Sequence, residues 1–259
     1  MLVRQPAVAG MFYPDNPLIL QRQVDDMLSS GTAAQLRPKA LIVPHAGYIY
    51  SGPIAASAYR LLRPLAGEIQ RVVLLGPSHR VAFRGLAAPD AHLFRTPLGD
   101  IAIDRDGIEQ LARKSLVTVR SDAHQLEHSL EVQLPFLQRT LDNFLLLPLV
   151  VGDASPPQVA QVLRHCWGGD ETLIVISSDL SHYHPYAEAQ QIDRHTSEMI
   201  QSFHYPIHGE QACGCRAING LMVLAQEENM EITTLDVRNS GDTAGDRDRV
   251  VGYGAYALY

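Results

Sequence analysis

The sequence lacks the features that mark several large classes of protein. It has only three cysteines (Cys166, Cys213 and Cys215), an odd and small number that argues against a disulfide framework and favours reduced thiols. The sequence contains no run of about 18 apolar residues, the length that a membrane-crossing helix needs. The first residues also lack the basic start and apolar core of a secretory signal. We therefore expect a cytoplasmic protein with no membrane partner.

Positive charge is also scarce. The chain has 21 Lys and Arg against 28 Asp and Glu, a net charge of −7, so a general nucleic-acid binder is not expected. Small molecules, metals or proteins are the expected partners. There is no Walker A motif, no GxGxxG after a strand, no GxSxG and no CxxC, which weighs against nucleotide-binding, serine-hydrolase and thioredoxin-like proteins.

Apolar residues, by contrast, are plentiful. They make up 46% of the 259 residues, enough for a sizeable core. Apolar runs of strand length alternate with segments of helical period, which predicts an α/β fold whose mostly parallel sheet is covered by helices. The expected strands are 39–44, 71–76, 144–152, 172–177, 231–237 and 250–259. Because no repeat or long linker interrupts them, we expect one domain over 1–259.

Capping residues predict where helices begin. Asn16 and Pro17 are typical of a cap and first residue, for a helix ending near Gly31, and Ser51 with Pro53 suggests the start of the next helix. Residues 77–104, rich in Pro and Gly, should form short strands and loops. Further helices are expected over 105–115, after Ser155 and Pro156, and over 186–202 and 214–229.

Polar side chains follow three of the predicted strands. LIVP leads into His45, VVLLGPS leads into His79, and LIVISS leads into Asp179, with His182 three residues later. Ligands of open α/β sheets bind beyond the carboxyl ends of the strands, so these residues can converge on one pocket. A surface or capping role for each residue is the alternative. Imidazole and carboxylate groups are ligands for iron, zinc or copper.

A thiol completes this set of candidates. Cys213 lies in EQACGCRAI, where a small-residue turn meets a predicted helix. A helix N-terminus lowers the pKa of a thiol, so Cys213 is a candidate third metal ligand or a nucleophile. For Cys215 we expect simple packing under the start of the helix.

A second cluster lies in AHQLEHSLEVQLPFL. Leucines recur there at helical spacing, which predicts a helix over 126–141 with a kink or boundary at Pro135. His124, His128 and Glu131 would share one face of that helix. The pattern is not HExxH, so we expect His128 or Glu131 to orient the metal ligands or the substrate, with direct metal ligation as the alternative.

Six blocks in order resemble the signature of one family: AVAGMFYP, PHAGYIYSG, LLGPSH, EHSLEVQLPFL, SSDLSHY and ACGCRAI. The chain resembles the Memo family, also called AmmeMemoRadiSam system protein B. That family is similar in fold to the LigB-type class III extradiol dioxygenases, which have a three-layer αβα architecture and use non-haem ferrous iron. The resemblance implies that His45, His79 and Cys213 hold iron or copper, or else zinc, with Asp179 and His182 as catalytic neighbours.

Three functions follow as hypotheses. The first is metal-linked redox or oxygen-dependent chemistry on an unknown small-molecule or peptide substrate. Ring cleavage itself does not carry over, because Cys213 replaces a carboxylate ligand. The second is a binding module for a peptide or partner protein, for which the family name implies radical-SAM and AMMECR-type partners. The third is a thiol-dependent hydrolase in which His182 or His45 acts as the base for Cys213.

Overall fold

The computed structural model describes residues 1–31 and 35–259. Its larger sheet has nine strands, and the four at its centre are parallel neighbours. In spatial order these are β2 (Ala40–Val43), β9 (Thr172–Ser177), β3 (Arg71–Pro77) and β8 (Leu145–Val151). They are buried along most of their length, because helices cover both faces of the sheet.

Antiparallel strands extend the sheet on both sides. Next to β2 lies β12 (Val250–Leu258), which also pairs with β11 (Ile232–Asn239) and β10 (His182–His184). Next to β8 lie β4 (Leu86–Ala88) and then β7 (Thr118–Val119). The two C-terminal strands, β11 and β12, therefore belong to the larger sheet, as predicted.

A separate small sheet joins the N-terminus to two strands of the segment rich in Pro and Gly. It contains β1 (Val3–Arg4), β5 (Leu93–Thr96) and β6 (Gly99–Ala102). Strands β4, β5 and β6 confirm the prediction of short strands and loops over 77–104.

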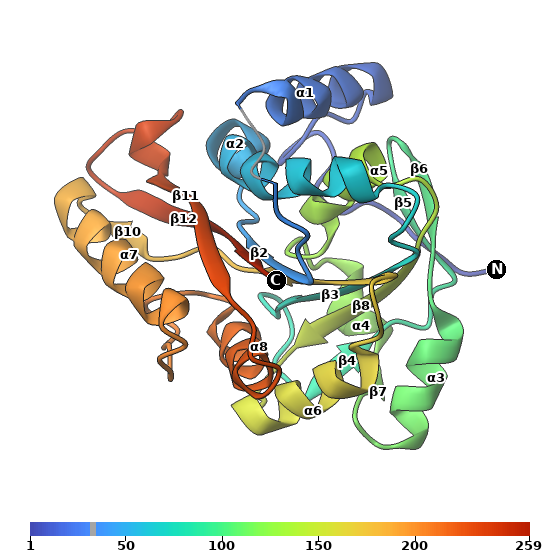
Figure 1. The fold of residues 1–259 in the computed structure, drawn as a ribbon. Coiled ribbons are helices and arrows are strands. Elements are labelled where there is room, and N and C mark those ends of the chain that lie inside the picture. Colours follow the sequence, from blue (N-terminus) through green and yellow to red (C-terminus); the bar gives the residue numbers. More distant parts are fainter. Residues whose placement is uncertain (32–34) are drawn as a thin grey trace.

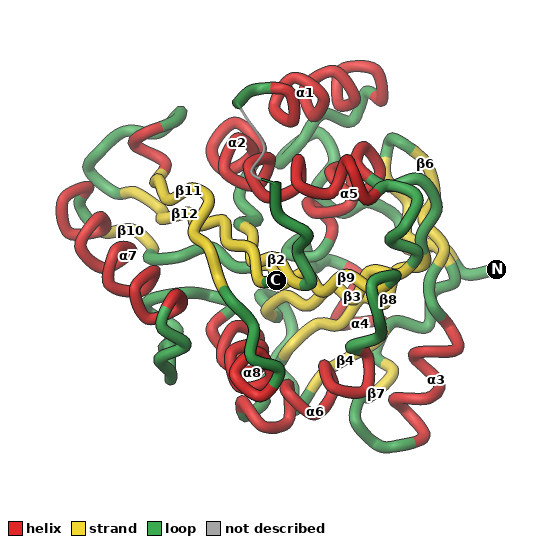
Figure 2. Tube along the Cα trace, viewed as in Figure 1, coloured by secondary structure: helices red, strands yellow, loops and turns green. Residues whose placement is uncertain are grey.

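The helices form two layers around the larger sheet (Figures 1 and 2). One layer contains α1, α2 and α5, the other contains α3, α6 and α8, and α7 packs on β11 and β12. This arrangement confirms the three-layer αβα prediction. The α-helices are α1 (Pro17–Ser29), α2 (Tyr48–Tyr59), α3 (Arg105–Arg113), α4 (Ser121–Gln125), α5 (Leu134–Thr140), α6 (Pro156–Cys166), α7 (Tyr186–Gln201) and α8 (Cys215–Glu227). Short 3-10 helices are Arg60–Leu65, Glu131–Gln133 and Ser240–Asp242.

The start of α1 is as predicted, whereas the start of α2 is not. The Asn16 side chain accepts hydrogen bonds from the backbone at the start of α1. Helix α2 begins at Tyr48 rather than at Ser51, and Pro53 lies inside it. The Gly47 carbonyl accepts the N–H of Ser51, so the first turn is complete before Pro53 withholds one N–H.

The predicted helix over 126–141 is wrong in its first half. Helix α4 ends at Gln125, and α5 begins only at Leu134, with Pro135 in its first turn where no N–H is needed. Between them the Glu127 carboxylate accepts the N–H of Ser129, which holds a turn instead of a helix. The apolar stripe itself is real, and all its leucines are buried: Leu130, Leu134, Leu137 and Leu141.

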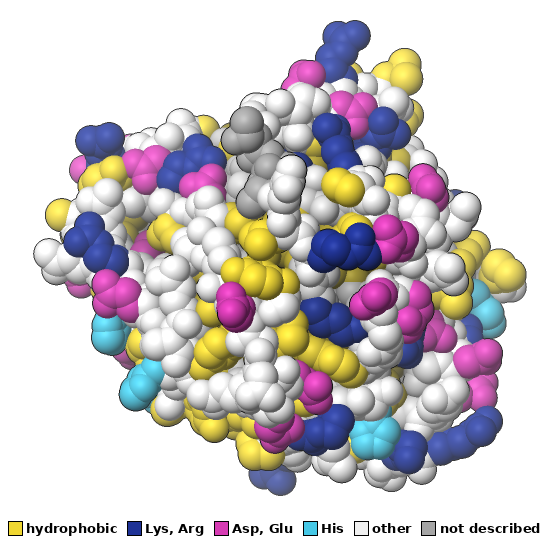
Figure 3. All heavy atoms as spheres, in the orientation of Figure 1, with side chains coloured by type: hydrophobic (Ala, Val, Ile, Leu, Met, Phe, Trp, Pro, Cys, Tyr) yellow, Lys and Arg dark blue, Asp and Glu magenta, His cyan; other side chains and the backbone are white. Residues whose placement is uncertain are grey.

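The surface carries charges of both signs. On the face drawn in Figure 3, basic and acidic side chains are interspersed. Among the helices of residues 1–31 and 35–259, none combines the length and apolarity that a membrane crossing needs.

The contact between α6 and α8 yields a stability prediction. A Cβ on Gly220 of α8 would lie 2.3 Å from the Cβ of Val159 in α6. Alanine is favoured over glycine inside a helix by about 1 kcal/mol. We nevertheless expect Gly220→Ala to lower the free energy of unfolding by about 1–3 kcal/mol, because the helices must move apart.

Chemical denaturation measures the change. Gly209→Ala is the control, because a Cβ there meets no atom within 4 Å among the described residues. A Gly220→Ala protein as stable as the wild type would contradict this close packing.

Candidate metal centre

Strand register brings the first two site residues together. Val43 of β2 pairs with Ser177 of β9, and His45 and Asp179 each follow two residues later. The backbone N–H of His45 donates a 2.7 Å hydrogen bond to Asp179 Oδ1. His45 and Asp179 are both buried. Two residues 134 positions apart are therefore fixed side by side at the carboxyl edge of the sheet.

Three imidazoles meet at this edge. One ring nitrogen from each of His45, His79 and His128 lies within 4.8 Å of the other two, and we call this set the histidine trio. The ring centres of His79 and His128 are 4.6 Å apart and stacked, and that of His45 is 5.2 Å from His79 and 5.6 Å from His128. The trio contains two of the three predicted metal ligands, His45 and His79, together with His128, for which direct metal ligation was the alternative expectation.

Hydrogen bonds determine which nitrogens face the centre. His45 Nδ1 lies 2.9 Å from Ser177 Oγ, and His79 Nδ1 lies 2.8 Å from Glu127 Oε1. Nε2 of each ring is therefore the nitrogen available to a metal.

Burial keeps two of the rings neutral. Desolvation, with the neighbouring His79 ring, lowers the pKa of His45 to about 3. Desolvation and His45 lower the pKa of His128 to about 4. At neutral pH both rings are therefore in the form that binds metals.

Glu127 is a site residue that the sequence reasoning missed. Its buried carboxylate accepts hydrogen bonds from the ring and the backbone N–H of His79, and lies 3.6 Å from His128 Nδ1. Burial alone would raise its pKa, but the bonds from His79 and Ser129 outweigh burial and lower the pKa to about 2. The only signal in the sequence was that Glu127 precedes His128. Glu131 is also close to His128 in the sequence, so this signal could not show which glutamate belongs to the site.

Cys213 lies against the trio, but its electrostatics differ from expectation. Its Sγ is 3.3 Å from His45 Nε2 and accepts the N–H of Asp179 at 3.3 Å. Helix α8 begins only at Cys215, so Cys213 precedes the cap. Desolvation and the Asp179 carboxylate raise the pKa of the Cys213 thiol. The expected lowering is wrong, which removes the main support for the thiol-hydrolase hypothesis.

Of the two expected catalytic neighbours, Asp179 lies beside the trio and His182 acts on it electrostatically. Burial raises the pKa of Asp179, whose Oδ2 is 4.0 Å from His45 Nε2. Half-buried His182 begins β10, and a charge on its ring lowers the pKa of both Asp179 and His45. These groups can exchange protons with a molecule bound at the trio.

Glu131 serves a different part of the molecule. Its carboxylate forms an ion pair with Arg4 and accepts bonds from the Tyr13 hydroxyl at 2.6 Å and the N–H groups of Ala7 and Val8 at 2.7 and 3.0 Å. All four partners lie in the N-terminal segment. We infer that Glu131 fixes that segment to the core.

The N-terminal segment in turn reaches the site. The Phe12 ring lies 4.8 Å from that of His128. His124 lies elsewhere, with its Nε2 2.9 Å from the Ala87 carbonyl. The expectation that His124, His128 and Glu131 share one helical face is therefore wrong.

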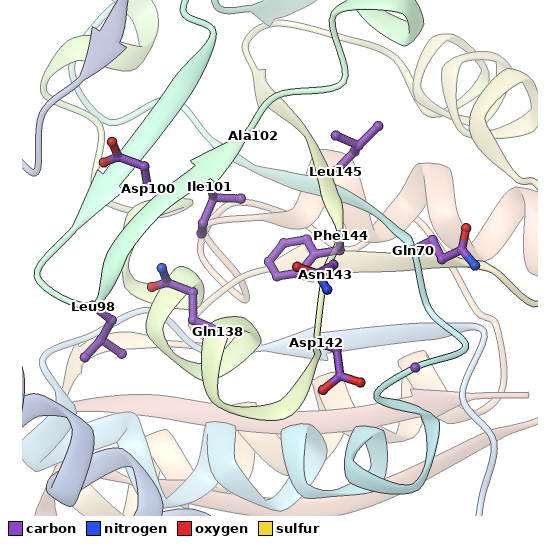
Figure 4. Close-up of a pocket in the computed structure, with 11 residues that line it drawn as sticks. Gln70, Leu98, Asp100, Ile101, Ala102, Gln138, Asp142, Asn143, Phe144 and Leu145 are labelled. Carbon is purple, nitrogen blue, oxygen red and sulfur yellow. The ribbon is translucent and has the colours of Figure 1, made fainter.

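Two cavities lie near the ends of the central strands. One, of about 820 Å³, is at the amino end of β8, and its lining residues include Gln70, Gln138 and Asn143 (Figure 4). Another, of about 220 Å³, is at the carboxyl ends of β3 and β8 and borders Cys213. Of these two cavities, the smaller one reaches Cys213, whose Sγ lies 3.3 Å from His45 Nε2.

The fold and this pocket define an α/β protein with clustered histidines at the carboxyl edge of a parallel sheet. The model of the family described as Memo-like protein matches residues 4–257, and the chain belongs to the Memo family. It is 36% identical to a MEMO1 family protein of Aquifex aeolicus, with 98% of each chain covered. It is 33% identical to one of Saccharolobus solfataricus, covering 96% of this chain and 97% of the relative.

A solved structure supports the fold alone. The crystal structure of an uncharacterized protein from Escherichia coli K12 matches with a TM-score of 0.52 at 12% identity. The match covers 83% of this chain and 98% of the other.

The role of Glu131 as an anchor can be tested by its effect on stability. Glu131→Gln leaves the buried Arg4 without its counter-ion, so we expect the free energy of unfolding to fall by about 3–5 kcal/mol. Glu109→Gln, in the exposed ion pair with Arg113, should cost less than about 1 kcal/mol. Urea denaturation of both variants measures the difference. Equal losses would contradict the anchoring role.

Proposed function

We propose that the histidine trio binds one transition-metal ion, and that the protein uses it for metal-linked redox or oxygen-dependent chemistry on a small substrate. The observation that carries this proposal is the convergence of three ring nitrogens within 4.8 Å at the carboxyl edge of the sheet. Imidazole ligands suit iron, copper and zinc. Iron or copper fits redox chemistry, because zinc does not change its oxidation state.

The surroundings of the trio favour a metal over a set of packed side chains. Hydrogen bonds orient the His45 and His79 rings from behind, as the outer partners of metal ligands do. The side chain of His79 is 29% exposed, so an ion can reach the trio from solvent. Cys213 lies beside His45 Nε2 and can add a thiolate ligand once a metal displaces its proton.

The remaining pocket groups would handle protons. A bound metal would supply Lewis-acid or redox chemistry. Asp179, whose pKa is raised by burial, can hold a proton beside the trio. Half-buried His182, whose charge acts on this carboxyl, can pass that proton on toward solvent.

The test is the metal content of anaerobically purified protein. We expect near-stoichiometric iron or copper in the wild type and its loss in His79→Ala and His128→Ala. His165→Ala, on an exposed ring of α6, is the matched control and should keep full occupancy.

Cys213→Ser separates the two ligand sets. Metal lost from Cys213→Ser but kept by His128→Ala would favour His45, His79 and Cys213 as the ligands. No metal in the wild type after reconstitution with ferrous, cupric or zinc ions would overturn the proposal and favour the binding module.

Glu127 yields a second prediction. Glu127→Gln removes the charge that orients His79, so we expect metal affinity to fall by about 10–100-fold. Competition with a chelator measures the affinity. Glu188→Gln is the matched control, because Glu188 makes a 2.9 Å contact with His184 in an exposed pair. Unchanged affinity in Glu127→Gln would show that His79 needs no such partner.

A further inference from the structure

The cavity of about 220 Å³ is lined in part by Cys213, the residue that contacts His45. Its walls come from the carboxyl ends of β3 and β8, the loop after β3, and the start of α8. This is where open α/β sheets bind their ligands. Much of the wall is apolar, formed by Pro77, Val81, Phe83, Val151 and Ala217.

Cys213 connects this cavity to the histidine trio. The residue lines the cavity, and its Sγ lies 3.3 Å from His45 Nε2. A molecule in the cavity is therefore one side chain away from a trio nitrogen.

Arg216 gives the cavity a charged end. Its Nη1 donates to the Ala154 carbonyl at 3.1 Å, which orients the guanidinium. Its Nη2 lies 2.9 Å from Asp153 Oδ1, in a pair whose side chains are 49% and 67% exposed. Such an exposed pair contributes about 0–1 kcal/mol, so another anion can replace Asp153.

The present partner of Arg216 indicates the chemistry of that anion. Asp153 also lines the cavity, and its carboxylate already occupies one donor of the guanidinium. Arg binds carboxylates through two parallel N–H groups. About half of the wall is apolar, which gives a short hydrocarbon body a surface to pack on that a fully hydrated ion such as phosphate would not use.

We propose that this cavity is the subsite for a small carboxylate with a short apolar body. The carboxylate binds Arg216, the body packs on the apolar wall, and the opposite end reaches Cys213. The proposal rests on the proposed function only in that chemistry at the trio would act on that opposite end. Binding itself depends on the cavity.

Valerate is the probe, and calorimetry or NMR titration of the full-length protein measures its binding. We expect saturable binding that valeramide and inorganic phosphate do not reproduce. From acetate to valerate, affinity should rise roughly three- to fourfold per methylene, until the cavity is filled. Binding of valeramide as tight as that of valerate would overturn the proposal.

Two substitutions should act in opposite directions. Arg216→Ala removes the charged partner and should weaken valerate binding roughly tenfold, with Arg216→Lys in between. Asp153→Asn removes the internal competitor and should tighten binding. Valerate affinity unchanged in both Arg216→Ala and Asp153→Asn would place the probe elsewhere and reject the subsite.

His79→Ala distinguishes this proposal from the metal proposal. Valerate binding retained in metal-free His79→Ala supports the subsite, whatever the metal analysis gives. Binding that disappears with the metal but survives Arg216→Ala would mean that the carboxylate binds the metal, and would overturn the subsite alone.

Discussion

The parallel pairing of β2 with β9 is the constraint on which the site depends. It places His45 next to Asp179, although the two residues are 134 positions apart in the sequence. The backbone N–H of His45 donates a 2.7 Å hydrogen bond to Asp179 Oδ1. Ser177, the last residue of β9, also helps to position the His45 ring. Its hydroxyl lies 2.9 Å from His45 Nδ1 and accepts a 2.7 Å bond from Gln133. A one-residue slip would send these side chains to opposite faces of the sheet.

Most of the fold could be predicted because the central strands are buried on both faces. Such strands are near-continuous apolar runs that the sequence displays directly. The segment 126–141 shows where this reasoning fails. Its leucines are buried as their spacing indicates, but burial of a stripe does not require a continuous helix. The bond from Ser129 to Glu127 and the position of Pro135 break the backbone pattern.

The site was predicted in composition better than in detail. His45, His79 and Asp179 converge as their places after strands predicted, and Cys213, singled out by its place before a helix, lies beside His45. Glu127 was missed because its role depends on His79, which lies 48 positions away. The pKa of Cys213 was expected to fall because a helix follows it. A helix terminus contributes less than about 2 kcal/mol, and desolvation of the thiol outweighs that.

The buried carboxylates of the protein differ in their charged partners. Glu131 has a cation of its own, because Arg4 forms an ion pair with it in the core. Within the described ranges, the ion-pair contacts of Glu127 and Asp179 are to imidazoles only. Two of those rings have pKa values lowered to about 3 and about 4, so they carry no charge at neutral pH. Buried anions are costly without a counter-charge. Asp179, whose pKa is raised by burial, can hold a proton, but Glu127 stays ionised and contacts His79 and His128. A metal cation at the histidine trio would supply the counter-charge for Glu127, and this supports a metal site over a packed histidine cluster.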